Sequence, residues 1–264
     1  MSLVFAAVVP HSPILIPSIG RDHLERLKRT TDALKSLEQE LYARNPDAIL
    51  IISPHGPVST DHFTIDFNDH YTCSLKEFGV FDSQIDCGAH MRLTNDLREH
   101  LEDRGLPIML RSEEALDYGT IVPLIYLAGH LPNPKILPLF PSLLPLKTHF
   151  DFGQVIKEVV MNSTVRVAIV ASADLSHRLT EEAPGGFSSR AKEFDDKISA
   201  LIRAGNGKGL VDFDLELARE AGECSLSTLT TFMGAMDGIG ASPEVLSYEG
   251  PFGIGYLVAH YKFA

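Results

Sequence analysis

Residues 3–13 read Leu-Val-Phe-Ala-Ala-Val-Val-Pro-His-Ser-Pro. The apolar run from Leu3 to Val9 has no basic segment before it and is too short to span a bilayer, so we expect neither a signal peptide nor a membrane helix here. Because the run is apolar on both faces and Pro10 ends it, the pattern is typical of a buried strand in a sheet that is covered on both sides.

Similar apolar segments recur along the chain and alternate with helical patterns. Strands are predicted at Val4 to Val9, Ala48 to Ile52, Ile136 to Phe140, Val165 to Ala171 and Gly255 to Tyr261. Helices are predicted at Arg21 to Arg44, Arg92 to Arg104, Ile121 to Leu127, Ser188 to Arg203, Leu215 to Ala221 and Leu226 to Met236. Thr64 to Cys73 alternates like an exposed or edge strand. The alternation predicts a single α/β domain, residues 1–264, in which helices flank a central, largely parallel or mixed β-sheet.

The composition is that of a compact globular protein. The 264 residues are 44% hydrophobic and 22% charged, which is close to the average for folded domains. The net charge of −12 argues against nucleic acid or an anionic membrane as a partner, because both require a basic face. The cysteines Cys73, Cys87 and Cys224 cannot all pair within one chain, so a reducing, cytoplasmic location is expected.

Three of the eleven histidines directly follow predicted buried strands. These are His11 in Val-Val-Pro-His, His55 in Ile-Ile-Ser-Pro-His and His177 in Ala-Ser-Ala-Asp-Leu-Ser-His. Ligands of open α/β sheets bind beyond the carboxyl ends of the strands, so these imidazoles are expected to converge. Convergent histidines indicate a metal site, whereas each histidine alone could simply cap its strand.

A further ligand is needed, and a carboxylate that joins two histidines suits iron(II). The best candidate is Glu223 in Ala-Gly-Glu-Cys-Ser-Leu, at a junction just before the apolar helix Leu226 to Met236. A buried carboxylate without a partner is costly, and metal binding would remove that cost. Two alternatives stay open, because Glu223 could instead cap the helix and the adjacent Cys224 could be the ligand.

Three other polar residues are candidates for the substrate side or for supporting contacts. Glu249 lies in a glycine-rich turn that could approach a ligand closely or serve the turn alone. Asp174 either orients His177 as a hydrogen-bond acceptor or caps its own loop. Tyr118 faces either the core or the pocket, while Asp117 before it is expected to cap a helix.

Motifs in a fixed order resemble the catalytic subunits of class III extradiol ring-cleavage dioxygenases. They are Val-Val-Pro-His-Ser-Pro at residues 8–13, Ile-Ser-Pro-His-Gly at 52–56, Asp-Tyr-Gly-Thr-Ile-Val-Pro-Leu at 117–124, Ser-Ala-Asp-Leu-Ser-His at 172–177 and Gly-Glu-Cys at 222–224. The resemblance covers nearly the whole chain. It is closest to the branch associated with AMMECR-type domains, which shares Ser-Tyr-Glu-Gly-Pro-Phe-Gly at 247–253 and is related to Memo-like proteins.

The resemblance implies iron(II) held by His11, His55 and Glu223, with His177 as the acid and base. It implies a small catechol- or aminophenol-type aromatic substrate that is cleaved with O₂. Two departures bear on this activity. Many ring-cleaving members have histidine where this chain has Tyr118, and Memo-like proteins place a cysteine near the position of the carboxylate, where Cys224 stands beside Glu223.

Two alternative functions therefore stay open. One is a Memo-like metal-binding protein without ring cleavage, and the other is a zinc hydrolase that uses the same ligands to activate water. Zinc or another divalent metal accordingly competes with iron(II) as the native ion. The sequence does not determine the oligomeric state, and it leaves both a homo-oligomer and a partner of the AMMECR type open.

Overall fold

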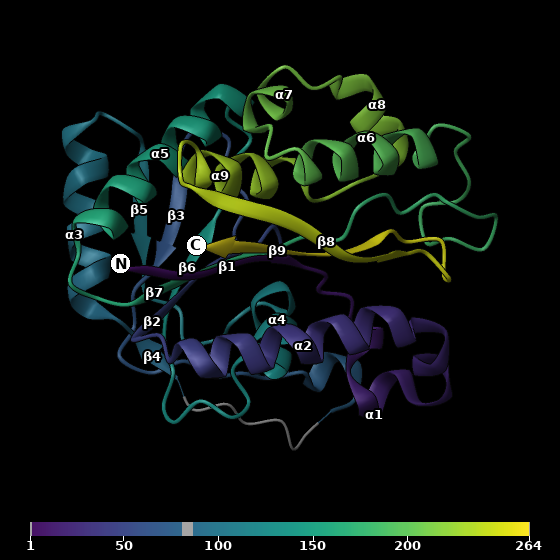
Figure 1. The fold of residues 1–264 in the computed structure, drawn as a ribbon, viewed down its shortest axis with the longest axis horizontal. Helices are drawn as coiled ribbons and strands as arrows, with labels where there is room; N and C mark the ends of the chain where they lie inside the picture. The colour runs from purple at the N-terminus through teal and green to yellow at the C-terminus, as the bar shows by residue number, and fades with distance from the viewer. Residues whose placement is uncertain (1, 81–86, 264) are drawn as a thin grey trace.

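The computed structural model of the protein describes residues 2–80 and 87–263, which form a single α/β domain around one mixed sheet (Figure 1). The strands are β1 (Leu3–Val9), β2 (Ala48–Ile52), β3 (Phe63–Asp66), β4 (Gly88–Ala89), β5 (Ile108–Arg111), β6 (Lys135–Phe140), β7 (Val167–Ser172), β8 (Ala241–Glu249) and β9 (Tyr256–Phe263). This architecture confirms the predicted α/β class.

The strand order places the predicted site at the carboxyl ends of the central parallel strands. The order is β5-β3-β6-β2-β7-β1-β9-β8, and β4 pairs with β6. Strands β6, β2, β7 and β1 are parallel neighbours, whereas β3 and β9 run antiparallel to them. Because parallel strands end at the same edge, the residues that follow β1, β2 and β7 come side by side.

Helices cover both faces of this sheet. The α-helices are α1 (Pro17–Gly20), α2 (Lys28–Arg44), α3 (Met91–Asp103), α4 (Tyr118–Leu127), α5 (Leu146–Asn162), α6 (Ala191–Arg203), α7 (Gly207–Val211), α8 (Leu215–Ala221) and α9 (Leu226–Met236), and the 3₁₀ turns are η1 (Pro13–Leu15), η2 (Arg21–Leu27) and η3 (Lys76–Phe78). In Figure 1, α5, α6 and α9 lie on one side of the sheet and α2 and α4 on the other. No helix in the described ranges has the length and apolar character needed to cross a membrane.

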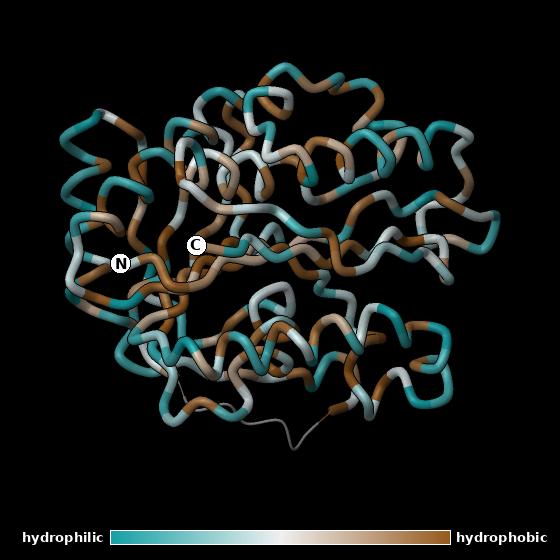
Figure 2. Tube along the Cα trace, in the orientation of Figure 1, coloured by the Kyte–Doolittle hydropathy of each residue, from teal (hydrophilic) through white to brown (hydrophobic). Residues whose placement is uncertain are grey.

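The strands contribute side chains to two hydrophobic cores, one on each face of the sheet. Successive residues of β1 alternate between them, so that Val8 packs in the core under α5 and α9 and Val9 packs in the core under α2 and α4. Figure 2 shows the hydrophobic segments concentrated in the strands between the helical layers. Burial of both strand faces explains why the apolar runs in the sequence are continuous instead of alternating.

The segment predicted as an exposed or edge strand, Thr64 to Cys73, behaves differently. Only Phe63–Asp66 forms a strand, β3, which lies between β5 and β6 and is buried along its length. The prediction of exposure was wrong because Asp66 is neutralised inside the protein. Both of its carboxylate oxygens accept hydrogen bonds from Arg111 of β5, each at 2.6 Å.

Other elements escaped the sequence prediction or were placed differently. Strands β5 and β8 and helix α5 were not predicted, and the predicted helix Arg21 to Arg44 divides into η2 and α2. Helix α5 carries Gly153 near its centre, which weakens its helical pattern. That glycine is needed because α5 packs closely against α9.

Substitution of Gly153 is expected to be destabilising. An added Cβ would lie 2.0 Å from the carbonyl oxygen of Thr231 in α9. We expect Gly153→Ala to lower the free energy of unfolding by about 1–3 kcal/mol, the usual cost of overpacking, as measured by chemical denaturation. The control is Gly240→Ala, at an exposed position with open space around the new methyl group. An equal effect of the two variants would contradict the close-packing explanation.

Candidate metal centre

The structure brings His11 and His55 together at the carboxyl ends of β1 and β2. Their Nε2 atoms are 2.8 Å apart, and the two rings are nearly perpendicular, with centroids 4.5 Å apart. His11 is buried, with 1% of its surface exposed, and His55 is half-buried. Strands β1 and β2 both run parallel to β7, which lies between them, so their carboxyl ends bring together two residues that are far apart in the sequence.

Cys224 completes a group of three candidate ligands. Its Sγ lies 3.6 Å from Nε2 of His11, and one ligand atom from each of His11, His55 and Cys224 lies within 4.8 Å of the others. Among residues 2–80 and 87–263, this is the group of His, Cys, Asp and Glu side chains whose ligand atoms lie that close together, and Glu223 is not part of it. Two imidazoles and one thiol are a donor set that suits zinc, iron or copper.

The protonation states of the histidines also suit a metal. Burial, together with the charge that His177 can carry, lowers the pKa of His11 to about 3. Burial and the charge on His11 lower the pKa of His55 to about 4. Both imidazoles are therefore neutral near pH 7, as metal ligands must be. Burial raises the pKa of the Cys224 thiol, and a coordinated cation would reverse this effect by favouring the thiolate.

The carboxylate of Glu223 is directed to the N-terminus of α9. Its Oε2 accepts hydrogen bonds from the backbone N–H groups of Ser225 at 2.5 Å and Leu226 at 2.7 Å. This is the helix-capping role that the sequence left open as an alternative. The neighbouring side chain, Cys224, instead faces His11.

Asp174 supports the backbone of His11. Its Oδ1 accepts a hydrogen bond from the backbone N–H of His11 at 2.9 Å, and its Oδ2 lies 3.7 Å from Nε2 of the same residue. Burial raises the pKa of Asp174 to about 6. Asp174 therefore anchors the turn after β1 and places a carboxyl group beside the candidate ligands.

Tyr118 covers the other histidine. Its ring stacks on His55 with centroids 4.3 Å apart, and its hydroxyl oxygen lies 3.0 Å from each ring nitrogen of His55. Tyr118 is the first residue of α4, and Asp117 caps this helix by accepting a hydrogen bond from the backbone N–H of Thr120 at 3.1 Å. Of the two orientations open to Tyr118, the structure shows the one toward the site.

The remaining predicted residues occupy different environments. The Nδ1 atom of His177 is buried and has no hydrogen-bond partner among the described residues. His177 lies close enough to influence the pKa of both His11 and His55. Glu249 is engaged elsewhere, because its Oε1 accepts hydrogen bonds from the backbone N–H and the hydroxyl of Thr30, at 2.8 and 2.6 Å.

Sequence reasoning missed two serines at the ends of adjacent strands. Ser53 follows β2 and donates a hydrogen bond to Asp117 at 2.5 Å. Ser172 ends β7, and its Oγ lies 2.9 Å from Nδ1 of His11. Both serines stand within the motifs that carry the histidines, but a serine at a strand end has no sequence signal that separates this role from simple solvation.

Gly119 leaves no space for a side chain beside the site. An added Cβ would lie 2.4 Å from Oγ of Ser53 and 3.2 Å from Cδ2 of His55. We expect Gly119→Ala to displace His55 and to weaken metal binding by about 10-fold or more, which is the scale of disturbed ligand support. Metal titration of Gly119→Ala tests this, with Gly240→Ala as the control variant. Equal metal affinities of the two variants would contradict the expected displacement of His55.

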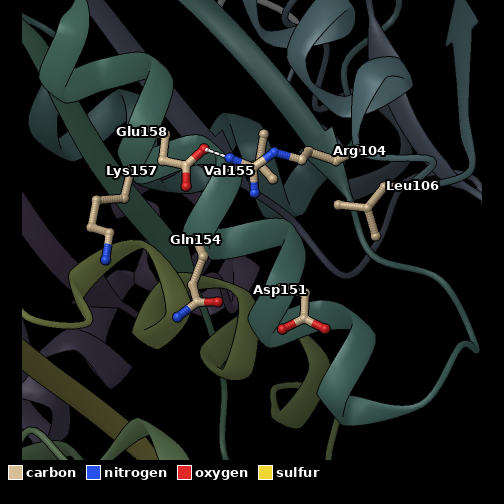
Figure 3. A pocket seen from close by; sticks show the side chains of 7 residues that line it. All are labelled: Arg104, Leu106, Asp151, Gln154, Val155, Lys157 and Glu158. Carbon is tan, nitrogen blue, oxygen red and sulfur yellow. Dashed lines mark hydrogen bonds and ion pairs between the residues drawn. The ribbon is translucent and has the colours of Figure 1, made fainter.

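Two surface cavities differ in their relation to this centre. The cavity shown in Figure 3 has a volume of about 330 Å³, lies between α3 and α5, and includes none of the predicted site residues. Its charged groups are already paired, since Arg104 binds Glu158 at 2.6 Å and Lys157 donates to the carbonyl of Asp237 at 2.6 Å. A second cavity, of about 520 Å³, adjoins the loop that carries Cys224 and is lined by Gly222, Glu223 and several leucines.

The fold recurs in a solved structure from Escherichia coli K12, the uncharacterized protein JW3007. The match has a TM-score of 0.70 and 17% sequence identity, and it covers 97% of this chain and 99% of the other. This likeness concerns the fold alone.

Three curated proteins are similar in sequence. Protein CA_C1420 of Clostridium acetobutylicum is 27% identical over 98% of this chain and 57% of its own length. A MEMO1 family protein of Methanosarcina mazei is 28% identical over 42% of this chain and 39% of its own length. The 2,3-dihydroxyphenylpropionate/2,3-dihydroxicinnamic acid 1,2-dioxygenase of Mycolicibacterium smegmatis is 24% identical over 63% of this chain and 54% of its own length. The chain thus spans about half the length of these relatives.

A family model covers almost all of the chain. Residues 5–259 match the family described as the catalytic LigB subunit of aromatic ring-opening dioxygenase. The matched range contains the paired strand-end histidines, Cys224 and the loop that carries His177. This chain therefore belongs to the LigB family of aromatic ring-opening dioxygenase catalytic subunits.

Proposed function

We propose that this protein is a metal-dependent oxidoreductase that opens the ring of a small catechol- or aminophenol-type aromatic with O₂. The observation that supports the proposal is the pair of strand-end histidines, His11 and His55, in a chain whose residues 5–259 match the catalytic subunit of aromatic ring-opening dioxygenases. The proposed ion is iron(II), and zinc or another divalent metal is the alternative. We propose Cys224 as the third ligand in place of Glu223, because the carboxylate of Glu223 caps α9.

In this proposal the metal would bring the aromatic hydroxyl groups and O₂ together and move electron density between them. The side chains of the protein transfer protons and hold the candidate ligands in place. His177 accepts the proton of a substrate hydroxyl and later returns it. This role suits an imidazole whose Nδ1 has no hydrogen-bond partner within residues 2–80 and 87–263. Tyr118 holds the ring plane of His55, and Asp174 holds the backbone of His11.

A second candidate function is metal binding without ring cleavage. The observation that favours it is the thiol in the ligand group, because a soft thiolate ligand shifts preference toward zinc or copper(I). The partial similarity to a MEMO1 family protein is consistent with this alternative.

One experiment separates the two candidates. The full chain is purified without chelators, its metal content is measured, and it is then loaded anaerobically with iron(II) and mixed with a panel of catechols and aminophenols. Ring cleavage predicts oxygen uptake matched by a coloured ring-opened product. His11→Ala is the control and is expected to bind no stoichiometric metal and to consume no oxygen. Stoichiometric metal in the wild type without oxygen uptake across the panel would support the second candidate instead.

A further inference from the structure

The hydroxyl group of Ser172 connects a candidate metal ligand to a helix backbone. Its Oγ lies 2.9 Å from Nδ1 of His11 and 2.5 Å from the carbonyl oxygen of Gly119. Ser172 is fully buried at the end of β7, and His11 is also buried, so water does not compete for either contact. Three segments that are distant in sequence therefore meet at one hydroxyl group.

The carbonyl of Gly119 is available to Ser172 because of a proline. In an α-helix this carbonyl would accept a hydrogen bond from the N–H four residues later, which here belongs to Pro123. Proline has no N–H, so the Gly119 carbonyl lacks its regular donor inside α4. The hydroxyl of Ser172 supplies the missing hydrogen bond.

The direction of this hydrogen bond determines the state of His11. A serine hydroxyl has one proton, and a carbonyl oxygen can only accept, so the Ser172 proton is directed to Gly119. The contact between Ser172 and His11 then needs a proton on Nδ1, which donates to the serine oxygen. In the neutral imidazole this leaves Nε2 unprotonated, with its lone pair toward His55 and Cys224.

We propose that Ser172 is a positioning residue that holds His11 in its Nδ1–H tautomer and so presents Nε2 to the metal. This inference rests on the proposed metal centre and adds the origin of the ligand's orientation. Pro123 takes part indirectly, because it frees the Gly119 carbonyl that orients the Ser172 hydroxyl. Hydrogen bonds to the second nitrogen of a ligating histidine are a general means of setting tautomer and metal affinity.

The tautomer is tested first in the metal-free full chain by NMR of ¹⁵N-labelled histidine, with His11→Gln used to assign the His11 signals. The wild type is expected to show a protonated Nδ1 and an unprotonated Nε2 at His11. Ser172→Ala is expected to populate the Nε2–H tautomer, and Ser172→Thr, which retains the hydroxyl, is expected to keep the wild-type pattern. A wild-type His11 protonated at Nε2 overturns the proposal, whether or not any variant folds.

Metal affinity gives the second readout, with iron(II) and zinc(II) titrated separately under anaerobic conditions. Ser172→Ala is expected to bind about 10- to 100-fold more weakly than the wild type. Pro123→Ala restores a helical donor for Gly119 and leaves Ser172 in place, so we expect a smaller loss together with a partial tautomer shift. The matched control is Ser247→Ala, a buried serine of β8 whose hydroxyl has no partner among the described residues.

The outcomes separate this inference from the proposed function. An unchanged tautomer in a folded Ser172→Ala variant overturns the role of Ser172, even if the enzyme cleaves aromatic rings. An equal loss of affinity in Ser247→Ala would also overturn it, because the effect would then be one of general packing. Conversely, a protein that shows the expected tautomers but no oxygen uptake refutes ring cleavage and leaves the positioning role intact.

Discussion

Cys224→Ser is expected to lower the affinity of the protein for iron(II) or zinc(II) by about 100-fold or more, which exceeds the usual cost of losing a supporting contact. Glu223→Gln is expected to have little effect. The reason is geometric, because Sγ of Cys224 lies 3.6 Å from Nε2 of His11, whereas Oε2 of Glu223 accepts hydrogen bonds from the start of α9. The measurement is anaerobic metal titration of both variants, followed by metal analysis.

The comparison has an internal control. Glutamine keeps an oxygen acceptor for the N–H groups of Ser225 and Leu226, so Glu223→Gln preserves the cap. Cys73→Ser makes the same chemical change as Cys224→Ser at a buried cysteine outside the ligand group, and its metal affinity should stay at the wild-type value. If Glu223→Gln loses the metal and Cys224→Ser retains it, the carboxylate set expected from the sequence is correct and ring cleavage gains support.

His177→Ala is expected to retain metal and to lose turnover by about 10²- to 10⁴-fold, the usual contribution of a positioned acid and base. His177 stands outside the group of three candidate ligands, and its buried Nδ1 has no described hydrogen-bond partner. The measurements are metal content and the rate of oxygen uptake with a substrate that the wild type cleaves.

A second histidine variant controls for general effects of this substitution. His100→Ala, at an exposed position on α3, should change neither metal content nor turnover. Loss of metal from His177→Ala would make His177 a ligand. Retention of full turnover would remove it from the chemistry and leave the proton transfer to another group.

The central fold could be predicted because its signals are local. The apolar runs of β1, β2 and β7 specify strands buried on both faces, and the prolines that follow β1 and β2 specify where the chain leaves the sheet. Given parallel strands, the histidines at their ends must share one edge. The burial of Asp66 could not be predicted in this way, because its partner Arg111 belongs to a strand that was not recognised.

The sequence by itself determined the α/β class and the pairing of His11 with His55, because short-range patterns set strand positions and strand positions set the edge of the sheet. Only the tertiary structure showed that the side chains of Glu223 and Cys224, which are adjacent in the chain, point in different directions. The N–H groups at the start of α9 attract the carboxylate, and the thiol is left facing His11. Tertiary packing likewise brought Ser172 between His11 and Gly119, because a hydroxyl group acquires its orientation from the partners that surround it.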